Sequence, residues 1–124
     1  MAYSIMMSGG ENMIDQSMLA NLKNELRRGT QVLAVLSQLD KTQYGYSLLQ
    51  DLEDKKVNIE AGTLYPLLRR LESQGLLKSE WDTSESRPRK YYLLSEDGKE
   101  VYQILLKEWN TIAEEMANLF KGEK

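Results

Sequence analysis

Two groups of basic side chains are the residues of this chain whose type and spacing could bind a ligand. Arg69 and Arg70 lie in a segment whose apolar residues have helical spacing and which ends at Gly75. Arg87, Arg89 and Lys90 follow within about 15 residues of that glycine. Exposed guanidinium and ammonium groups bind phosphate oxygens and, in a groove, base edges. A basic helix beside a hairpin with a charged tip is the arrangement that a DNA-binding winged helix needs.

Catalytic chemistry finds little support, because the chain has neither histidine nor cysteine. The usual imidazole base and thiol nucleophile are therefore missing, and a transition-metal site would need carboxylates alone. We expect no enzyme activity, no metal and no cofactor. The absence of cysteine fits a cytoplasmic protein, and the absence of a long apolar run predicts no membrane span.

The charge distribution is uneven although the net charge is only −3. Residues 61–94 carry six basic and four acidic side chains, whereas the segments 1–60 and 95–124 carry net charges of −2 and −3. Local charge governs phosphate attraction within a Debye length of about 10 Å. The segment with the basic helix and hairpin is thus the one suited to a polyanion, although the asymmetry is modest.

Apolar periodicity predicts three helices before the hairpin. We expect a flexible arm over residues 1–16, a first helix over 17–39 that contains Gly29, and a second helix over 43–54 capped by Thr42. The third helix should begin between residues 59 and 63 and end at Gly75, a common C′ residue. Pro66 should then lie near its first turn, or distort the helix locally.

Two short strands and a long helix complete the predicted fold. Residues 76–82 and 89–94 alternate as strands around the polar loop 83–88, and Ser95 is a good N-cap for a helix over residues 96–120. The fold class is mainly α with a small β-hairpin: a winged helix-turn-helix domain over 17–95 and a C-terminal dimerisation helix over 96–124.

The last predicted helix has an apolar face broader than its own domain could cover. Its seam positions are three or four residues apart: Val101, Leu105, Trp109, Ile112, Met116 and Leu119. Packing against a second copy, with the first helix contributing, would bury this face in a homodimer. The alternative is a tail that folds back on its own domain.

The third helix divides into core and exposed positions. Its leucines at 64, 67, 68 and 71 are predicted core residues. The candidate DNA-binding residues are Tyr44, Thr63, Tyr65, Arg69, Arg70, Arg87, Arg89 and Lys90. For the cations the alternative is a solvated charged surface. One tyrosine of each pair, 44/46 and 91/92, should be core, with Tyr44 the better candidate for a phosphate contact.

These residues together resemble the PadR family of bacterial transcriptional regulators. The matching segments are Leu26-Arg27-Arg28-Gly29, Tyr44-Gly45-Tyr46, the run from Gly62 to Glu72, Gly75-Leu76 and the run from Arg89 to Gly98. The resemblance spans residues 22–119 and implies a winged helix-turn-helix, a dimerisation helix and repression relieved by a small molecule. Ser95 stands where the family more often has threonine, and both residues cap helices.

The resemblance also implies an effector site on the last helix. Trp109 sits where the family often has a tryptophan, and at a dimer seam it could stack a small aromatic effector, with Met116 nearby. The alternative is that both side chains merely fill the interface.

The function expected from the sequence is sequence-specific binding of double-stranded DNA by a homodimeric regulator. We expect a repressor on a palindromic operator. The alternative is a winged-helix module for protein–protein interaction that binds an acidic partner through the arginines. Sequence-selective, salt-sensitive DNA binding separates the two.

Overall fold

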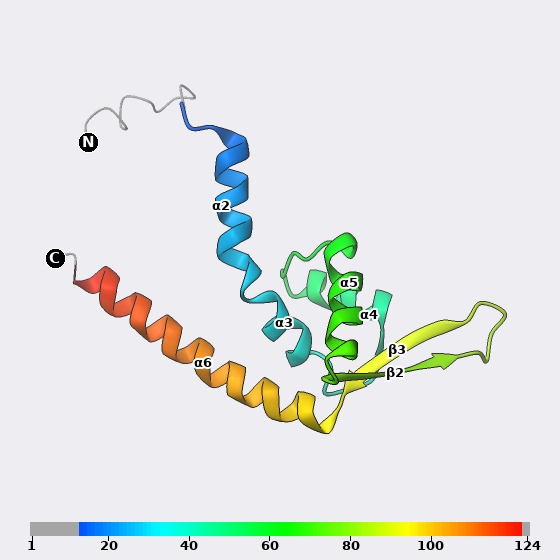
Figure 1. The fold of residues 1–124 in the computed structure, drawn as a ribbon. Coiled ribbons are helices and arrows are strands. Elements are labelled where there is room, and N and C mark those ends of the chain that lie inside the picture. Colours follow the sequence, from blue (N-terminus) through cyan, green and yellow to red (C-terminus); the bar gives the residue numbers. More distant parts are fainter. Residues whose placement is uncertain (1–12, 123–124) are drawn as a thin grey trace. The chain divides into compact units, whose positions relative to one another are not determined.

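The computed structural model describes residues 13–122, which fall into two units that divide after Thr30. The first unit holds helix α2 (Gln16–Arg28), and the second holds all other elements (Figure 1). The Asp15 carboxylate caps α2 by accepting hydrogen bonds from the backbone N–H groups of Ser17 (2.9 Å) and Met18 (3.3 Å). Most of the predicted flexible arm, residues 1–12, lies outside the described residues.

The single first helix predicted for residues 17–39 is wrong, because the chain turns at Gly29 and Thr30. Helix α2 ends at Arg28, and α3 occupies Gln31–Ser37. The backbone N–H and the hydroxyl of Thr30 both donate to the carbonyl of Arg27, at 2.9 and 2.8 Å. These hydrogen bonds of Thr30 compete with those that would continue the helix, and Gly29 beside it already lowers helix stability.

A three-stranded antiparallel sheet replaces the simple hairpin. Strands β2 (Leu77–Asp82) and β3 (Arg89–Leu94) form the predicted hairpin, and β1 (Gln43–Tyr44) pairs with the other edge of β3, in the order β1–β3–β2. Because Gln43 and Tyr44 pair with Tyr92 and Tyr91, helix α4 begins at Gly45 and runs to Asp54. The predicted cap at Thr42 is therefore wrong, since Tyr44 occupies the N-cap position without a side-chain bond.

Helix α5 (Ala61–Ser73) begins and ends where the sequence predicts. Gly75 follows it with φ +82°, the left-handed conformation that favours glycine after a helix. Pro66 is the sixth residue of α5, beyond the first turn, and the helix runs through it without interruption. Pro66 thus lies just beyond the first turn, near the predicted position, and the local distortion named as the alternative does not interrupt the helix.

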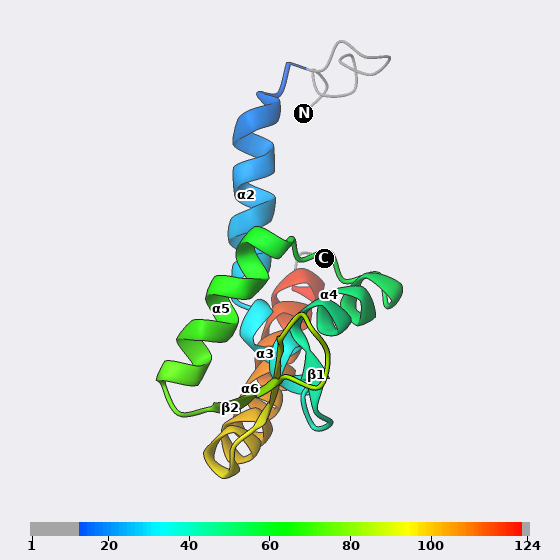
Figure 2. The same cartoon turned by 90° about the vertical axis from the view of Figure 1, so that its right-hand side faces the viewer.

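The core lies between α3, α4, α5 and the sheet, and leucine dominates it. Its buried apolar residues are Val35, Leu36, Leu39, Leu48, Leu52, Ile59, Leu64, Leu67, Leu68, Leu71, Leu77, Tyr92 and Leu94. All four predicted core leucines of α5 are among them. Figure 2 looks along the hairpin, with α5 and α4 on either side above it.

Helix α6 (Glu96–Lys121) is anchored at its beginning and exposed beyond it. The Ser95 hydroxyl accepts from the Gly98 N–H (2.9 Å), which confirms the predicted cap, and donates to the Gly75 carbonyl (2.6 Å). Val101, Tyr102 and Leu105 pack partly against the core, after which α6 extends away from it (Figure 1). No helix within residues 13–122 is long and apolar enough to cross a membrane.

Gly98 is the position where this anchor admits no side chain. A Cβ there would lie 2.0 Å from the Leu76 carbonyl oxygen. Alanine normally stabilises a helix interior by about 1 kcal/mol relative to glycine. We expect Gly98→Ala to lower the free energy of unfolding instead, by about 1–3 kcal/mol, as overpacked sites do. Urea denaturation at a fixed protein concentration measures this change.

Gly62→Ala is the matched control for this prediction. Gly62 also lies in a helix, but a Cβ there would meet no atom within 4 Å. This variant should be unchanged or more stable. Equal stability of the two variants would contradict the close contact between Gly98 and Leu76.

Candidate nucleic-acid interface

Helix α5 carries four of the eight side chains predicted to contact DNA. Thr63, Arg69 and Arg70 are exposed, as expected. Tyr65 differs, because it is half-buried and its ring lies beside Gly45 at the start of α4. A Cβ at position 45 would be 2.7 Å from Tyr65 Cε1, so glycine makes room for the ring.

Side-chain alternation divides the hairpin into two faces. Ser79, Lys90 and Tyr92 lie on the face toward α5, and Asp82, Arg89 and Tyr91 lie on the opposite face. Arg89 and Lys90 of β3 are therefore on opposite faces of the sheet and contact different residues, although they are adjacent in sequence. Tyr92 is buried and Tyr91 is half-buried, which confirms the prediction for this pair.

Lys90 joins the hairpin to α5. Its Nζ lies 3.2 Å from Glu72 Oε1, 5.4 Å from the centroid of the Tyr92 ring and 5.9 Å from that of Trp81. Glu72 also accepts a hydrogen bond from the Ser79 hydroxyl. That hydrogen bond, assisted by Lys90, lowers the pKa of the Glu72 carboxyl. These contacts fix the hairpin relative to the basic helix.

Arg89 lies among aromatic rings on the other face. Its guanidinium carbon is 4.3 Å from the centroid of the Tyr44 ring, and its Nη1 donates to the Tyr46 hydroxyl at 3.0 Å. The two tyrosine rings are stacked with centroids 5.8 Å apart and planes 9° apart. Neither is a core residue, since Tyr44 is half-buried and Tyr46 is 55% exposed, so that part of the prediction is wrong.

Asp82 holds the Tyr44 ring in place. The Tyr44 hydroxyl donates to Asp82 Oδ2 at 2.5 Å, and Ser84 donates to Oδ1 from its hydroxyl (2.7 Å) and its backbone N–H (3.0 Å). Chiefly because of the Tyr44 hydroxyl, the pKa of Asp82 falls from 3.8 to about 2. The same hydrogen bond raises the pKa of Tyr44. The hydroxyl predicted to contact phosphate thus already has a partner.

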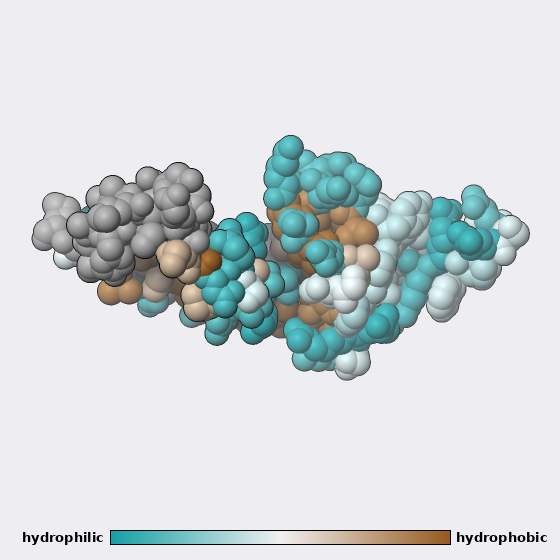
Figure 3. Space-filling view, turned by 90° about the horizontal axis from the view of Figure 1, so that it is seen from above, coloured by the Kyte–Doolittle hydropathy of each residue, from teal (hydrophilic) through white to brown (hydrophobic). Residues whose placement is uncertain are grey.

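Three predicted cations remain without a carboxylate partner. Within residues 13–122, no ion pair joins Arg69, Arg70 or Arg87 to an acidic side chain. Arg87 lies in the polar loop 83–88 at the end of the hairpin, the teal and white projection in Figure 3. These three guanidinium groups are available to phosphate oxygens.

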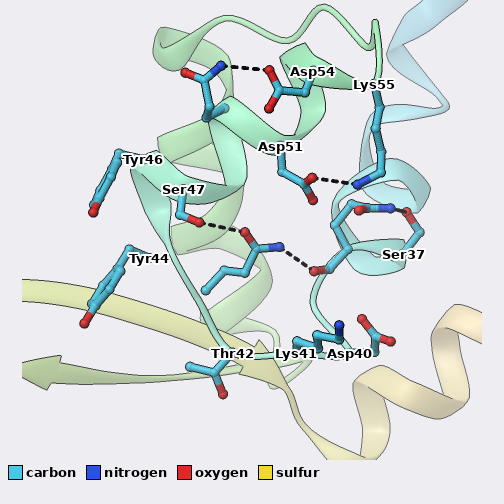
Figure 4. Close-up of a pocket in the computed structure, with 13 residues that line it drawn as sticks. Ser37, Asp40, Lys41, Thr42, Tyr44, Tyr46, Ser47, Asp51, Asp54 and Lys55 are labelled. Carbon is cyan, nitrogen blue, oxygen red and sulfur yellow. Dashed lines mark hydrogen bonds and ion pairs between the residues drawn. The ribbon is translucent and has the colours of Figure 1, made fainter.

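Two hollows border these residues. A hollow of about 280 Å³ separates α5 from the hairpin, lined by Tyr44, Gly45, Tyr46, Tyr65, Trp81, Arg89, Lys90 and Tyr92. A second hollow, of about 1010 Å³, lies between the segment 37–44 and α4 and is lined by residues of polar type (Figure 4). There Lys55 pairs with Asp51 at 2.6 Å, and the rings of Tyr44 and Tyr46 point away from that pair.

The two predicted effector residues lie on the free part of α6. Trp109 is 43% exposed and Met116 is 39% exposed. Seven residues, about two turns, separate them, so they share one face of the helix. The structure places them on a different element from the basic residues of α5 and the hairpin.

Comparison with known proteins identifies the class of protein. The profile of the transcriptional regulator PadR-like family matches residues 32–104, which is more than half of the chain. The chain belongs to this family. A solved PadR family regulator from Eggerthella lenta is 47% identical with a TM-score of 0.78, over 85% of this chain and 94% of that one.

Other PadR-like proteins are similar at lower identity. A PadR family regulator from Clostridium difficile is 32% identical with a TM-score of 0.67, over 74% of this chain and 99% of that one. The transcriptional regulator Rv3488 of Mycobacterium tuberculosis is 38% identical over 60 residues, which are 48% of this chain and 56% of that protein. PadR-like proteins are regulators, so the winged-helix fold and the non-enzymatic class are confirmed.

Some residues that build the candidate interface of this PadR-like chain were not predicted from its sequence. The basic residues of the hairpin were predicted, but Glu72, Asp82 and strand β1, which hold Lys90, Tyr44 and β3 respectively, were not. A signal was present, since Asp82 and Arg89 are opposite each other if the two strands pair around loop 83–88. The two-residue β1 has no periodicity that could be recognised.

Tyr44→Phe should raise the pKa of Asp82 from about 2 toward 3.8, because it removes the strongest hydrogen bond to that carboxylate. A folded-state pKa below the unfolded value stabilises the protein above about pH 4 and loses this effect as the pH falls toward 2. The variant should therefore lose less stability over that pH range. NMR titration of the Asp82 side-chain carboxyl carbon measures the pKa directly.

Tyr46→Phe serves as the control, because the Tyr46 hydroxyl bonds Arg89 and not Asp82. It should leave the pKa of Asp82 near 2. A similar rise in both variants would show that the stacked rings, and not the Tyr44 hydroxyl, hold the carboxyl in its ionised form.

Proposed function

We propose that this PadR-like regulator binds double-stranded DNA through α5 and the hairpin as a homodimer. The observation that carries the proposal is the joint position of the basic groups. Arg69 and Arg70 are exposed on α5, and Lys90 ties the hairpin to that helix through Glu72, so both elements present cations from one rigid support. The N-terminal part of a recognition helix reaches base edges, a position that Thr63 occupies in α5, whereas Arg69 and Arg70 near its C-terminal end would bind phosphates.

The dimer is proposed from the apolar surface outside the core. On α6, Ile104, Trp109, Ile112, Met116, Leu119 and Phe120 are 39–67% exposed, and on α2, Met18, Leu22 and Leu26 are 49–82% exposed. Such a surface is large for a monomer and typical of a protein interface. A two-fold dimer would present two copies of α5 to a palindromic operator, with half-sites about one helical turn or a multiple of it apart.

Repression relieved by a small aromatic effector completes the proposed function. Operator occupancy would block transcription. An aromatic molecule stacked on Trp109 between paired α6 helices would change the distance between the two recognition helices. The exposed ring of Trp109 and the flexible side chain of Met116 on the same helix face support this site.

Arg69→Ala with Arg70→Ala should weaken binding to the DNA upstream of this protein's own gene by at least tenfold in low salt. The slope of log K against log salt should become shallower by about 0.9 for each phosphate that the variant no longer binds. Fluorescence anisotropy with the native fragment and a scrambled duplex, over a salt series, measures both quantities.

Lys107→Ala is the charge-matched control for each arginine, since Lys107 is an exposed cation on α6. It should bind like the unmodified protein. Equal weak binding to both duplexes would contradict an operator in this region. No binding even at low salt would replace the DNA proposal with protein–protein interaction through the arginines.

Ile112→Glu should dissociate the dimer, because it places a carboxylate in the centre of the exposed apolar face of α6. Burying an unpaired charge costs several kcal/mol, about enough to shift a micromolar dimer fully to monomer. Gln103→Glu adds the same charge two and a half turns away, on the opposite side of the helix, and should remain dimeric. Sedimentation equilibrium distinguishes the outcomes, and a dimeric Ile112→Glu protein would contradict this interface.

A further inference from the structure

Four acidic side chains accompany the basic residues of the segment 61–94, and three of them have fixed structural partners. Glu72 accepts from Ser79 and pairs with Lys90, Glu80 accepts from the Tyr91 hydroxyl at 2.8 Å, and Asp82 accepts from Tyr44 and Ser84. Each of these contacts joins or shapes elements of the fold. Their role is to position the hairpin.

Glu85 is the exception. It lies in the loop 83–88, its side chain is 68% exposed, and it accepts no hydrogen bond from the described residues. Among residues 13–122 its single ion-pair partner is Arg89, with 3.6 Å between Glu85 Oε1 and Arg89 Nη2. A long, exposed pair of this kind contributes little to stability. Glu85 is therefore not needed to build the hairpin.

Arg89 is positioned without the help of Glu85. The Tyr44 ring under its guanidinium and the Tyr46 hydroxyl on Nη1 already fix the side chain. Nη2 is the nitrogen next to Glu85, and a guanidinium uses its paired edge nitrogens to bind carboxylate or phosphate. The Arg89 guanidinium thus binds the Glu85 carboxylate in the free protein, and in a complex it could bind a DNA phosphate through the same nitrogen.

We propose that Glu85 is an affinity-limiting residue that occupies Arg89 in the free protein and must release it when a DNA phosphate binds. This inference rests on the proposed DNA-binding function. The exchange of one anion for another reduces the net gain from the Arg89–phosphate contact. Because phosphate contacts carry no sequence information, Glu85 weakens binding to every duplex by the same factor. Its effect is to lower the affinity for operator and non-specific DNA alike.

Glu85→Gln should therefore tighten binding about two- to fivefold in low salt, the range expected for one exposed ion pair. The gain should be the same for the native fragment and for a scrambled duplex, and the salt slope should be unchanged, because Arg89 binds the same phosphate in both proteins. Fluorescence anisotropy over a salt series measures all three. Glu100→Gln, an equal charge change at an exposed position of α6, should leave binding unchanged.

A double-mutant cycle with Arg89→Gln tests whether Glu85 acts through Arg89. Glu85→Gln should give no gain when Arg89 is absent. A gain that persists without Arg89, or one equalled by Glu100→Gln, would overturn the proposal in favour of general repulsion between acidic side chains and DNA. Unchanged affinity of Glu85→Gln, with tight binding by the unmodified protein, would overturn it as well. Failure of every variant and the unmodified protein to bind would instead refute the proposed function, and this inference with it.

Discussion

Strand β3 is the element on which the rest of this structure depends, because it pairs with β1 on one edge and β2 on the other. Its six residues alternate between the two faces of the sheet. Tyr92 and Leu94 enter the leucine core, while Arg89 and Tyr91 contact Tyr44 of β1. The end of β3 makes two further links. The Leu94 N–H donates to the Leu39 carbonyl (3.1 Å), and the N–H of Ser95, the next residue, donates to the Leu76 carbonyl (3.0 Å). A single strand thereby links α4, α5, the hairpin and the beginning of α6.

This central position of β3 explains how a short hairpin can hold its cationic side chains in fixed positions. An isolated two-stranded hairpin is at best marginally stable in water. Here the third strand, the Lys90–Glu72 pair and the Asp82–Tyr44 hydrogen bond hold both of its faces. The acidic residues of the segment are therefore part of the basic interface, because they determine where its cations lie. Net charge alone would have suggested a poor DNA-binding protein.

The sequence predicted the parts of the fold that repeat with a regular period. The apolar spacing located α5, α6 and the two long strands nearly to the residue, and Gly75 and Ser95 marked helix ends correctly. Errors occurred where tertiary contacts overrode local preference. Gln43 and Tyr44 were assigned to a helix but pair with β3, and Thr30 ends the first helix through bonds that periodicity does not record. The sequence placed the basic residues on α5 and the hairpin, whereas the carboxylate partners of Arg89 and Lys90 depend on how the elements pack and could not be paired from sequence alone.

The exposed apolar surface of α2 and α6 has a consequence for stability. The buried core is confined to the second unit, and α2 contributes no buried residue to it. A helix without tertiary packing is only marginally stable in water, so long exposed helices of this kind gain their stability by packing against a partner surface. If that partner is a second copy, folding of α2 and of the outer part of α6 is coupled to association, and stability depends on protein concentration. The elements around the leucine core, α3, α4, α5 and the sheet, do not share this dependence. The leucine core that supports α5 and the hairpin is thus separate from the exposed apolar positions of α2 and of the outer part of α6.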